Sequence, residues 1–575
     1  MLRNSSSDDN HRQAAAGSES HDARGVFFGA WAVAAGVLLV CAGLVQAAEY
    51  TVKLDGTGKF RTIQACADAA MAGDTCSVYA GTYSEHVETA RGGVSDDKRI
   101  TFKAHGVVTM QGFDIQHPYV TVEGFDITGY RVSYAGHITV AYGGDYCQIR
   151  NNTIRDGLAK VAGLDFSQSD RQVANHCVVV GNTLSNLRYV FLDLNGDGHL
   201  FEQNTFENQN GMDFIRLFGT NHVFRRNVFR NGATVADSAG HPDFVQTFGR
   251  ASGATENHLF EENWIQNLQS QFSQLNSGDG VVMKGILYAN VRNVVFRRNI
   301  ILNVSYNANI GMPGVRFENN TIYRLAHQLS GISFGGSLTR GDATGGVLKG
   351  NVFLAGSSRA LAEDGSSGYY SLSGAVLGKE VIAVFVTKER NSSGNITSQG
   401  PIAAGLFNNL KSSGYINSNG GILSKARSLS SISQFVLSDS FSAFKQAMYE
   451  HLMKTVQLDA SIRSTFLADY NFVAGSEAAG FPAKRSVDCV AGATYTGGNF
   501  CEPHGVNGGS PELSNLANPL GPDGIPFTLD DGLKPTPGSP LCGKGEGGAD
   551  IGAYSCDPNK VFPNQPKPPG NLIIR

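Results

Sequence analysis

The sequence predicts an all-β protein whose chain winds into a solenoid of parallel strands. Three observations support this fold class: a repeat of 21–23 residues, two purely apolar positions in every repeat, and Asn residues concentrated in one region. Of the 41 Asn residues in the chain, 24 fall between residues 151 and 320. Gly and Asn at this density disfavour long helices, and the absence of a three-residue Gly period excludes collagen.

The composition excludes two further classes of protein. Hydrophobic residues make up 41% of the chain and charged residues 17%, which is enough apolar material for a core and excludes wholesale disorder. The net charge of −4 lacks the basic excess of nucleic-acid-binding proteins, so no nucleic-acid partner is expected. A monomer is the expected state.

An Asn recurs at the same position of eight aligned segments and anchors the repeat. The anchors are Asn152, Asn182, Asn204, Asn227, Asn263, Asn299, Asn320 and Asn351. The third residue before the anchor and the second residue after it are apolar in every copy, so both should point into a core. The residue two before the anchor should face outward. From Glu202 onward its charge alternates in sign between copies, as strands stacked about 4.8 Å apart require.

Three other positions of the repeat predict side chains stacked on successive coils. Four residues after the anchor, a second Asn column can form a hydrogen-bonded ladder: Asn186, Asn208, Asn231, Asn267 and Asn303. Five residues before the anchor, His199, His222 and His258 share a column, which favours structural stacking over metal binding. Cys147 and Cys177 occupy the same column and should be neighbours, either as two thiols or as a disulfide.

These columns and the coil length resemble the right-handed parallel β-helix of the pectate-lyase-like superfamily. The resemblance implies about 10–12 coils and a β-helix over residues 48–356. Residues 62–87 resemble the family's entry, in which a short amphipathic helix caps the core before the first strand. Cys66 and Cys76 would then bridge helix and strand.

The remaining segments divide around this β-helix. Residues 1–47 hold an apolar run followed by Val45-Gln46-Ala47, which predicts a secretory signal or, if uncleaved, a membrane anchor. Either would place the chain outside the cytoplasm, at the cell surface, in the periplasm or secreted, where its other eight Cys favour disulfides. Residues 357–466 form a Ser/Gly-rich insertion with one amphipathic helix, residues 467–562 the C-terminal coils and cap, and residues 563–575 a flexible tail.

A column of carboxylates suggests a metal site. Three aligned segments place Asp213, Asp243 and Asp279 at the heads of successive strands, and Asp165 and Asp193 are expected to extend that column downward. Stacked carboxylates repel unless a cation neutralises them, and calcium accepts several oxygen ligands. The sequence therefore predicts that calcium binds here, unless these Asp residues are ordinary turn residues.

Amide and basic side chains near this column suggest where a substrate binds. Gln246 and Asn276 supply amides that would contact it. The resemblance to polysaccharide lyases implies a Lys or Arg base beside calcium, and Lys284 is the predicted base, with Arg216 and Arg250 binding a uronate carboxylate. The simpler alternative is that these are solvated surface charges.

His241 precedes Pro-Asp in an inserted loop and could serve acid–base chemistry or sugar contact. The alternative is a surface histidine.

No complete catalytic set of the superfamily transfers to this chain. The Gly-His-Gly and Arg-Ile-Lys segments of polygalacturonases and the Trp-x-Asp-His segment of common pectate lyases are absent. The first hypothesis is an exported protein that cleaves an acidic, uronate-containing polysaccharide by calcium-assisted β-elimination. The alternatives are a glycoside hydrolase with paired Asp carboxylates and a non-catalytic glycan-binding surface or adhesion protein.

Overall fold

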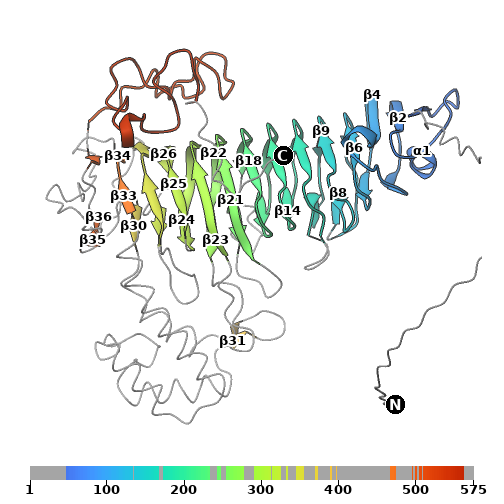
Figure 1. The fold of residues 1–575 in the computed structure, drawn as a ribbon, viewed down its shortest axis with the longest axis horizontal. Coiled ribbons are helices and arrows are strands. Elements are labelled where there is room, and N and C mark those ends of the chain that lie inside the picture. The colour runs from blue at the N-terminus through green and yellow to red at the C-terminus, as the bar shows by residue number, and fades with distance from the viewer. Residues whose placement is uncertain are drawn as a thin grey trace, which may run out of the picture. The chain divides into compact units, whose positions relative to one another are not determined.

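In the computed structural model, the described residues fold as a right-handed parallel β-helix, which confirms the predicted fold class (Figure 1). They run from residue 47 to residue 562 with gaps. The gaps are residues 134, 159, 168–172, 233–242, 248–253, 277–290, 313, 326–331, 335–344, 355–369, 373–388, 391–395, 398–466, 474–494, 497–498, 501–503 and 508. The predicted signal or anchor, the predicted insertion helix and the tail therefore lie outside the described residues.

Strands of successive coils pair in parallel and form three stacks. Stack A contains β1 (Glu49–Val52), β2 (Thr75–Thr82), β4 (Ile100–Met110), β6 (Val120–Glu123), β9 (Gln148–Arg150), β12 (Val178–Val180), β15 (Leu200–Glu202), β18 (Val223–Arg225), β21 (Thr255–Glu261), β23 (Val291–Arg297), β25 (Arg316–Glu318), β28 (Val347–Lys349) and β33 (Leu467–Asp469).

Stack B follows the Asn corner of each coil. It contains β7 (Asp126–Ile127), β10 (Thr153–Arg155), β13 (Thr183–Ser185), β16 (Thr205–Gln209), β19 (Val228–Gly232), β22 (Trp264–Asn276), β24 (Ile300–Gly311), β26 (Thr321–Leu325), β29 (Val352–Leu354), β34 (Phe472–Val473) and β37 (Val506–Asn507). The pairing of β33 with β28 and of β34 with β29 returns residues 467–473 to the solenoid.

Stack C closes each coil. It contains β3 (His86–Glu88), β5 (Gly112–Ile115), β8 (Ala135–Val140), β11 (Val161–Asp165), β14 (Leu192–Leu194), β17 (Ile215–Leu217), β20 (Asp243–Thr247), β27 (Ile332–Phe334) and β30 (Tyr370–Leu372). The long strands β22 and β24 contribute their first halves to stack B and their second halves to stack C.

A few short elements lie outside the three stacks. They are the helix α1 (Ile63–Ala69), the 3-10 helices η1 (Asp96–Lys98) and η5 (Glu546–Gly548), and two antiparallel strand pairs, β31 (Glu389–Arg390) with β32 (Ile396–Thr397) and β35 (Tyr495–Thr496) with β36 (Asn499–Phe500).

The apolar columns predicted from the repeat form the interior of the solenoid. Phe201, Phe224, Phe260 and Phe296 stack on successive rungs, with ring centroids 5.0, 4.4 and 4.9 Å apart. All are fully buried. One residue per coil therefore extends a continuous core, which explains why a repeat of 21–23 residues suffices for each turn.

The anchor Asn residues form a buried amide ladder at the corner between stacks A and B. Oδ1 of Asn263 accepts both the backbone N–H and Nδ2 of Asn227, each at 3.0 Å. Nδ2 of Asn263 donates to Oδ1 of Asn299 and to the carbonyl of Phe224, each at 2.9 Å. Only a side-chain amide donates and accepts in this way, so the corner selects Asn. The exposed Asn column is also confirmed as a ladder, with Asn208 donating to Asn186 at 3.2 Å.

Opposite charges alternate along the outward face of stack A, as predicted. Glu261 pairs in register with Arg225 below and Arg297 above. Its carboxylate contacts the two guanidinium groups at 3.2 and 2.7 Å. The alternation lets charges share adjacent rungs without repulsion.

The first coil is closed by α1, as predicted. Thr62 caps the helix by accepting the backbone N–H of Ala65, and Glu85 accepts the N–H groups of Ile63 and Gln64. The disulfide Cys66–Cys76 joins α1 to β2, which confirms the pairing that the resemblance implied.

Replacing both Cys66 and Cys76 by Ser should lower the stability of the first coils by about 2–3 kcal/mol, because the disulfide closes a loop with a sequence separation of 10. Amide hydrogen exchange of α1 and β2 measures this loss. The matched control replaces Cys542 and Cys556, whose disulfide lies in the C-terminal segment, and should leave exchange of α1 unchanged. Equal protection of α1 in both double variants would contradict the expectation.

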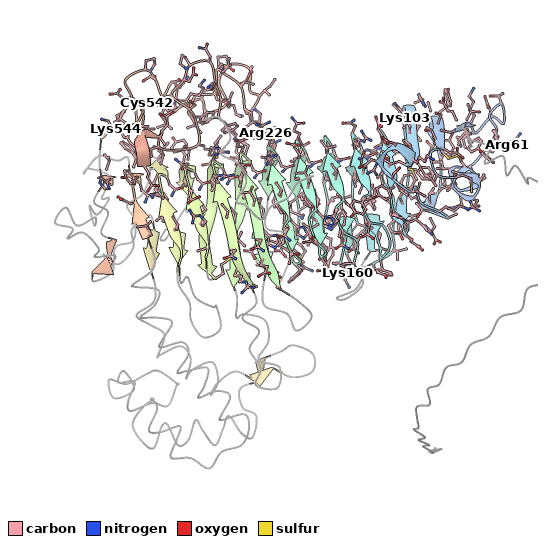
Figure 2. The ribbon with its side chains drawn as sticks, in the orientation of Figure 1. Arg61, Lys103, Lys160, Arg226, Cys542 and Lys544 are labelled. Carbon is pink, nitrogen blue, oxygen red and sulfur yellow. A yellow bond between two sulfur atoms is a disulfide. The ribbon has the colours of Figure 1, made fainter. Side chains whose placement is uncertain are left out.

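The C-terminal segment, residues 504–562 (red in Figure 1), covers the outward side of stack B on the last coils of the solenoid. There the outward side chains of stack B are apolar, including Trp264, Ile300 and Phe472. They pack against Leu541, Tyr554 and other apolar residues of the C-terminal segment. Figure 2 shows Cys542 in this segment and Arg226 near its border with the coils. Within the described part of the chain, no helix is long and apolar enough to span a membrane.

Candidate functional site

Stack C carries a line of polar side chains, one on each successive coil, which we call the polar row. Pairing in register aligns its members: Glu88, Asp114, Thr139, Asp165, Asp193, Arg216 and Gln246. For the five members from Asp114 to Arg216, the residues on either side belong to the hydrophobic core, as Leu192 and Leu194 do around Asp193. The strands therefore hold these seven side chains in fixed order on one face.

The polar row breaks the rule of alternating charge that stack A follows. Asp165 and Asp193 are direct neighbours in register. Two carboxylates on rungs about 4.8 Å apart repel each other, which costs stability unless one of them holds a proton. Glu88 and Asp114 are a second pair of carboxyl groups in register on this row, so like charges on adjacent rungs occur twice in the described part of the polar row.

Asp165 has the environment of a carboxylic acid whose pKa is raised. It is only 5% exposed, and one carboxylate oxygen accepts the backbone N–H and the hydroxyl of Ser167 at 2.8 and 3.1 Å. Burial raises the pKa of Asp165 from 3.8 to about 6, the contacts to Ser167 oppose the shift, and the charge of Asp193 adds to it. Two adjacent carboxyl groups with different environments suit acid–base chemistry.

Arg216 is the cation of the polar row, one rung above Asp193. Its guanidinium contacts Asp213 Oδ2 at 3.1 Å and the hydroxyl of Tyr189 at 2.9 Å. Burial alone would lower the pKa of Arg216, but Asp213, Tyr189 and Asp193 outweigh it and raise the pKa. The side chain is 22% exposed, so it can still meet a ligand.

Asp213 and Asp243 are in contact, as the aligned segments suggested. They lie beside the polar row and are not members of it. The backbone N–H of Asp243 donates to Asp213 Oδ1 at 2.9 Å, and Gln246 Nε2 donates to Asp243 Oδ2 at 3.2 Å. Both carboxylates are buried. The prediction that Asp165 and Asp193 extend this column is wrong, because those two residues align with Arg216 and Gln246 instead.

The other predicted site residues fall outside the described part of the chain: Lys284, Arg250, His241 and Asp279. Asn276 ends β22 in register with Gly311, and its side chain is not described. Among the residues that are described, no group of three or more His, Cys, Asp or Glu side chains is placed to hold a metal ion.

The histidine column is structural, as predicted. His199, His222 and His258 are buried and their rings stack at 4.9 and 5.0 Å. Nδ1 of each ring accepts the backbone N–H of the column residue on the coil below, beginning with Cys177. Cys177 accepts the N–H of Cys147 in the same way, so of the two predicted alternatives the thiol pair is present.

Sequence reasoning missed Tyr189 and the common register of Asp165, Asp193, Arg216 and Gln246. Asp193 and Arg216 each lie 11 residues before the next anchor Asn, whereas Asp165 and Gln246 each lie 17 residues before it. The loops that join stack C to stack A differ in length, so the distance to the anchor does not fix the rung. The equal distances of Asp193 and Arg216 from their anchors, and of Asp165 and Gln246 from theirs, were the signal in the sequence for this register.

No protein-family model and no curated protein matches the chain. Among solved structures, a tailspike protein of E. coli bacteriophage HK620 in complex with a hexasaccharide aligns with 52% of this chain and 58% of its own, at 12% identity and a TM-score of 0.36. The PL6 family polysaccharide lyase of Pseudopedobacter saltans aligns with 52% of this chain and 86% of its own, at 14% identity and a TM-score of 0.32. Pectate lyase Pel9A aligns with 62% of this chain and 89% of its own, at 13% identity and a TM-score of 0.30. The chemistry of the site must be derived from the residues of this chain.

Proposed function

We propose that this protein hydrolyses glycosidic bonds of a polysaccharide along the polar row of stack C. The observation that carries the proposal is the pair Asp165 and Asp193, two carboxyl groups on adjacent rungs of which one is buried and has a pKa of about 6. Glycoside hydrolysis needs such a pair, one member as acid and the other as carboxylate. The two disulfides agree with an exported protein, because disulfides persist in oxidising compartments.

The geometry assigns a role to each member of the site. Asp165, which is protonated below about pH 6, would protonate the oxygen of the leaving sugar. Asp193 would attack the sugar carbon as the bond to the leaving sugar breaks, since carboxyl groups about 5 Å apart leave no room for a water molecule between acid and nucleophile. A water molecule deprotonated by Asp165 would then break the bond between the sugar and Asp193. Arg216 and Gln246, on the next two rungs, would bind hydroxyl or carboxylate groups of the following sugar units.

Incubation with acidic and neutral polysaccharides (pectate, alginate, glycosaminoglycan, glucan and xylan) should release reducing ends from one of them without a rise in ultraviolet absorbance. The first product should retain the anomeric configuration, because the two carboxyl groups are one rung apart. The rate should fall above about pH 6, where Asp165 loses its proton. Products with a new C=C bond, or binding without any cleavage, would contradict hydrolysis.

A second candidate is β-elimination of a uronate-containing polysaccharide, and the observation that favours it is the partly exposed guanidinium of Arg216 on the polar row. Arg216 and Arg250 would bind the uronate carboxylate, Lys284 would remove the adjacent proton, and His241 would assist or contact the sugar. The ultraviolet absorbance of the unsaturated product distinguishes this reaction from hydrolysis.

Calcium was expected to support β-elimination, and Asp213 and Asp243 as described do not offer it a binding site. Both oxygens of Asp213 are engaged, by Arg216 and by the N–H of Asp243, and Gln246 donates to Asp243. Asp279, the third predicted ligand, lies outside the described residues. The proposal that calcium binds therefore rests on Asp279. The test compares the rate of product formation with added calcium and with a chelator.

A further inference from the structure

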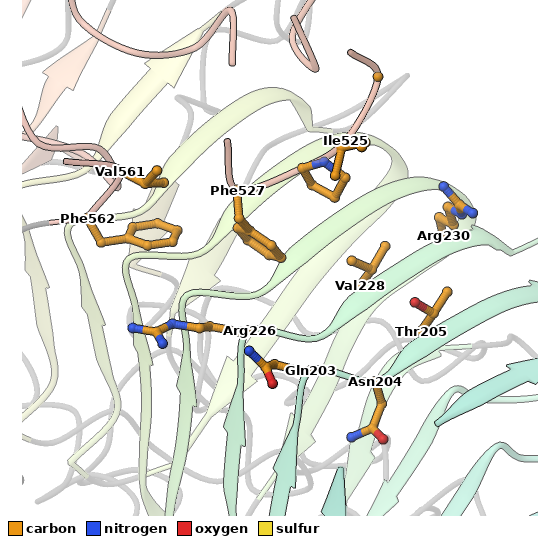
Figure 3. Close-up of a pocket in the computed structure, with 12 residues that line it drawn as sticks. Gln203, Asn204, Thr205, Arg226, Val228, Arg230, Ile525, Phe527, Val561 and Phe562 are labelled. Carbon is orange, nitrogen blue, oxygen red and sulfur yellow. The ribbon is translucent and has the colours of Figure 1, made fainter. Parts of the chain in front are cut away.

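A groove lies between stack B and the edge of the C-terminal segment that packs on it (Figure 3). Its volume is about 890 Å³, a size typical of sites for small ligands. The residues that line it are Gln203, Asn204, Thr205, Arg226, Val228, Arg230, Gly524, Ile525, Pro526, Phe527, Val561 and Phe562. This groove is built from stack B and the C-terminal segment, whereas the polar row belongs to stack C.

The floor of the groove is polar and is held by the coils. Thr205 and Val228 are neighbours in register on β16 and β19. On the next coil the corresponding position is Trp264, which the C-terminal segment buries. The C-terminal segment therefore stops covering the outward surface of stack B at Val228. Thr205, one rung below Val228, carries the first hydroxyl group on the uncovered part.

The opposite wall is aromatic and apolar, and packing fixes its rings. Phe527 meets Trp264 edge to face with ring centroids 6.0 Å apart, and Phe562 stacks on Tyr554 at 5.8 Å. Ile525 is 57% exposed at the mouth. Figure 3 shows the side chains of Phe527 and Ile525 on the side of the groove opposite Val228 and Thr205.

Both charged residues that line the groove are arginines. Arg226 is 38% exposed and pairs with Glu262, which is fully buried behind it. Arg230 is 40% exposed and pairs with Glu207, which does not line the groove. Among the described residues, no carboxylate faces the space, so the groove favours an anionic ligand.

We propose that this groove binds a uronate-bearing oligosaccharide, at a site separate from the polar row. The apolar face of a sugar ring would pack on Phe527 and Phe562, Arg226 and Arg230 would pair with the carboxylates, and Gln203 and Thr205 would bind hydroxyl groups. The site would hold an acidic stretch of a polymer whichever reaction occurs at the polar row, and also if none occurs there.

Calorimetric titration with trigalacturonate, an alginate trisaccharide and neutral cellotriose tests the proposal. The titration uses the full chain carrying Asp193→Asn, which removes turnover at the polar row. At least one uronate trisaccharide should bind, and more tightly than cellotriose. Thr205→Trp, which fills the groove, and Arg230→Ala should each weaken that binding at least tenfold.

Matched controls come from the same strand rows outside the groove. Thr183 lies one rung below Thr205, and Arg155 shares the row of Glu207 and Arg230. Thr183→Trp and Arg155→Ala should leave the affinity unchanged.

Three results would overturn the proposal: no binding of either uronate trisaccharide, equal binding of cellotriose, or binding that Thr205→Trp leaves intact.

Discussion

Replacing Asp193 by Asn is expected to lower kcat for polysaccharide cleavage by at least about 10³-fold, because the variant lacks the carboxylate that the proposed mechanism uses as nucleophile. Asp193 lies in register with Asp165, the buried carboxyl group of the polar row whose pKa is raised to about 6, and one rung below Arg216. Asparagine keeps the shape and removes the nucleophilic charge. Initial-rate measurements on the polymer that the wild-type protein cleaves give the effect.

The matched control is Glu202→Gln, which changes an outward carboxylate of stack A. Like Asp193, Glu202 is partly exposed, and it pairs in register with Arg225. This variant should retain full activity. Equal kcat values for the wild-type protein and Asp193→Asn would contradict a catalytic role for the carboxylate pair.

Asp165→Asn should also abolish cleavage, and it should stabilise the fold at alkaline pH. The folded-state pKa of Asp165 is about 6 against 3.8 for the ordinary side chain. Its ionisation therefore costs stability as the pH rises from about 4 through 6. A neutral amide avoids about 2–3 kcal/mol of this cost at pH 8. A gain in urea resistance together with lost activity would show that the buried acid serves function rather than stability.

Replacing Asn263 by Ala is expected to lower the free energy of unfolding by about 3–5 kcal/mol, because buried polar groups lose their partners. The backbone N–H and Nδ2 of Asn227, the carbonyl of Phe224 and Oδ1 of Asn299 would each lose a hydrogen bond. Urea unfolding followed by circular dichroism measures the loss.

Asn231 provides the control for that substitution, because it belongs to the exposed Asn ladder. Its φ of 60° lies in the left-handed region, so Asn231→Gly removes the amide without backbone strain. This variant should lose less than about 1 kcal/mol, since exposed amides can bond to water. A similar loss in both variants would contradict the distinction between the buried and the exposed ladder.

The repeat predicted stacks A and B closely, because both adjoin the anchor Asn. A short, constant segment joins Phe260 to Asn263 and Asn263 to Ile265, so one alignment fixes which side chains face the core. The alternating charges and the stacked histidines follow from the same alignment.

Stack C could not be placed in this way, because loops of variable length separate it from the anchor on both sides. Asp213 and Asp243 align well by their local sequence, yet they lie at the start of their strands, and Arg216 and Gln246 occupy the polar row. The contact between Tyr189 and Arg216 joins residues that are 27 apart in sequence. Pairing across coils, which the local sequence does not encode, brings such groups together.

The most direct test of the carboxylate pair is a crystal structure of the Asp193→Asn variant soaked with an oligosaccharide of the polymer that the wild-type protein cleaves. The proposed mechanism predicts a sugar chain along stack C, with a glycosidic oxygen within hydrogen-bonding distance of Asp165 and the next sugar contacting Arg216. Electron density for the sugar on another face, with Asp165 remote from every glycosidic oxygen, would contradict it.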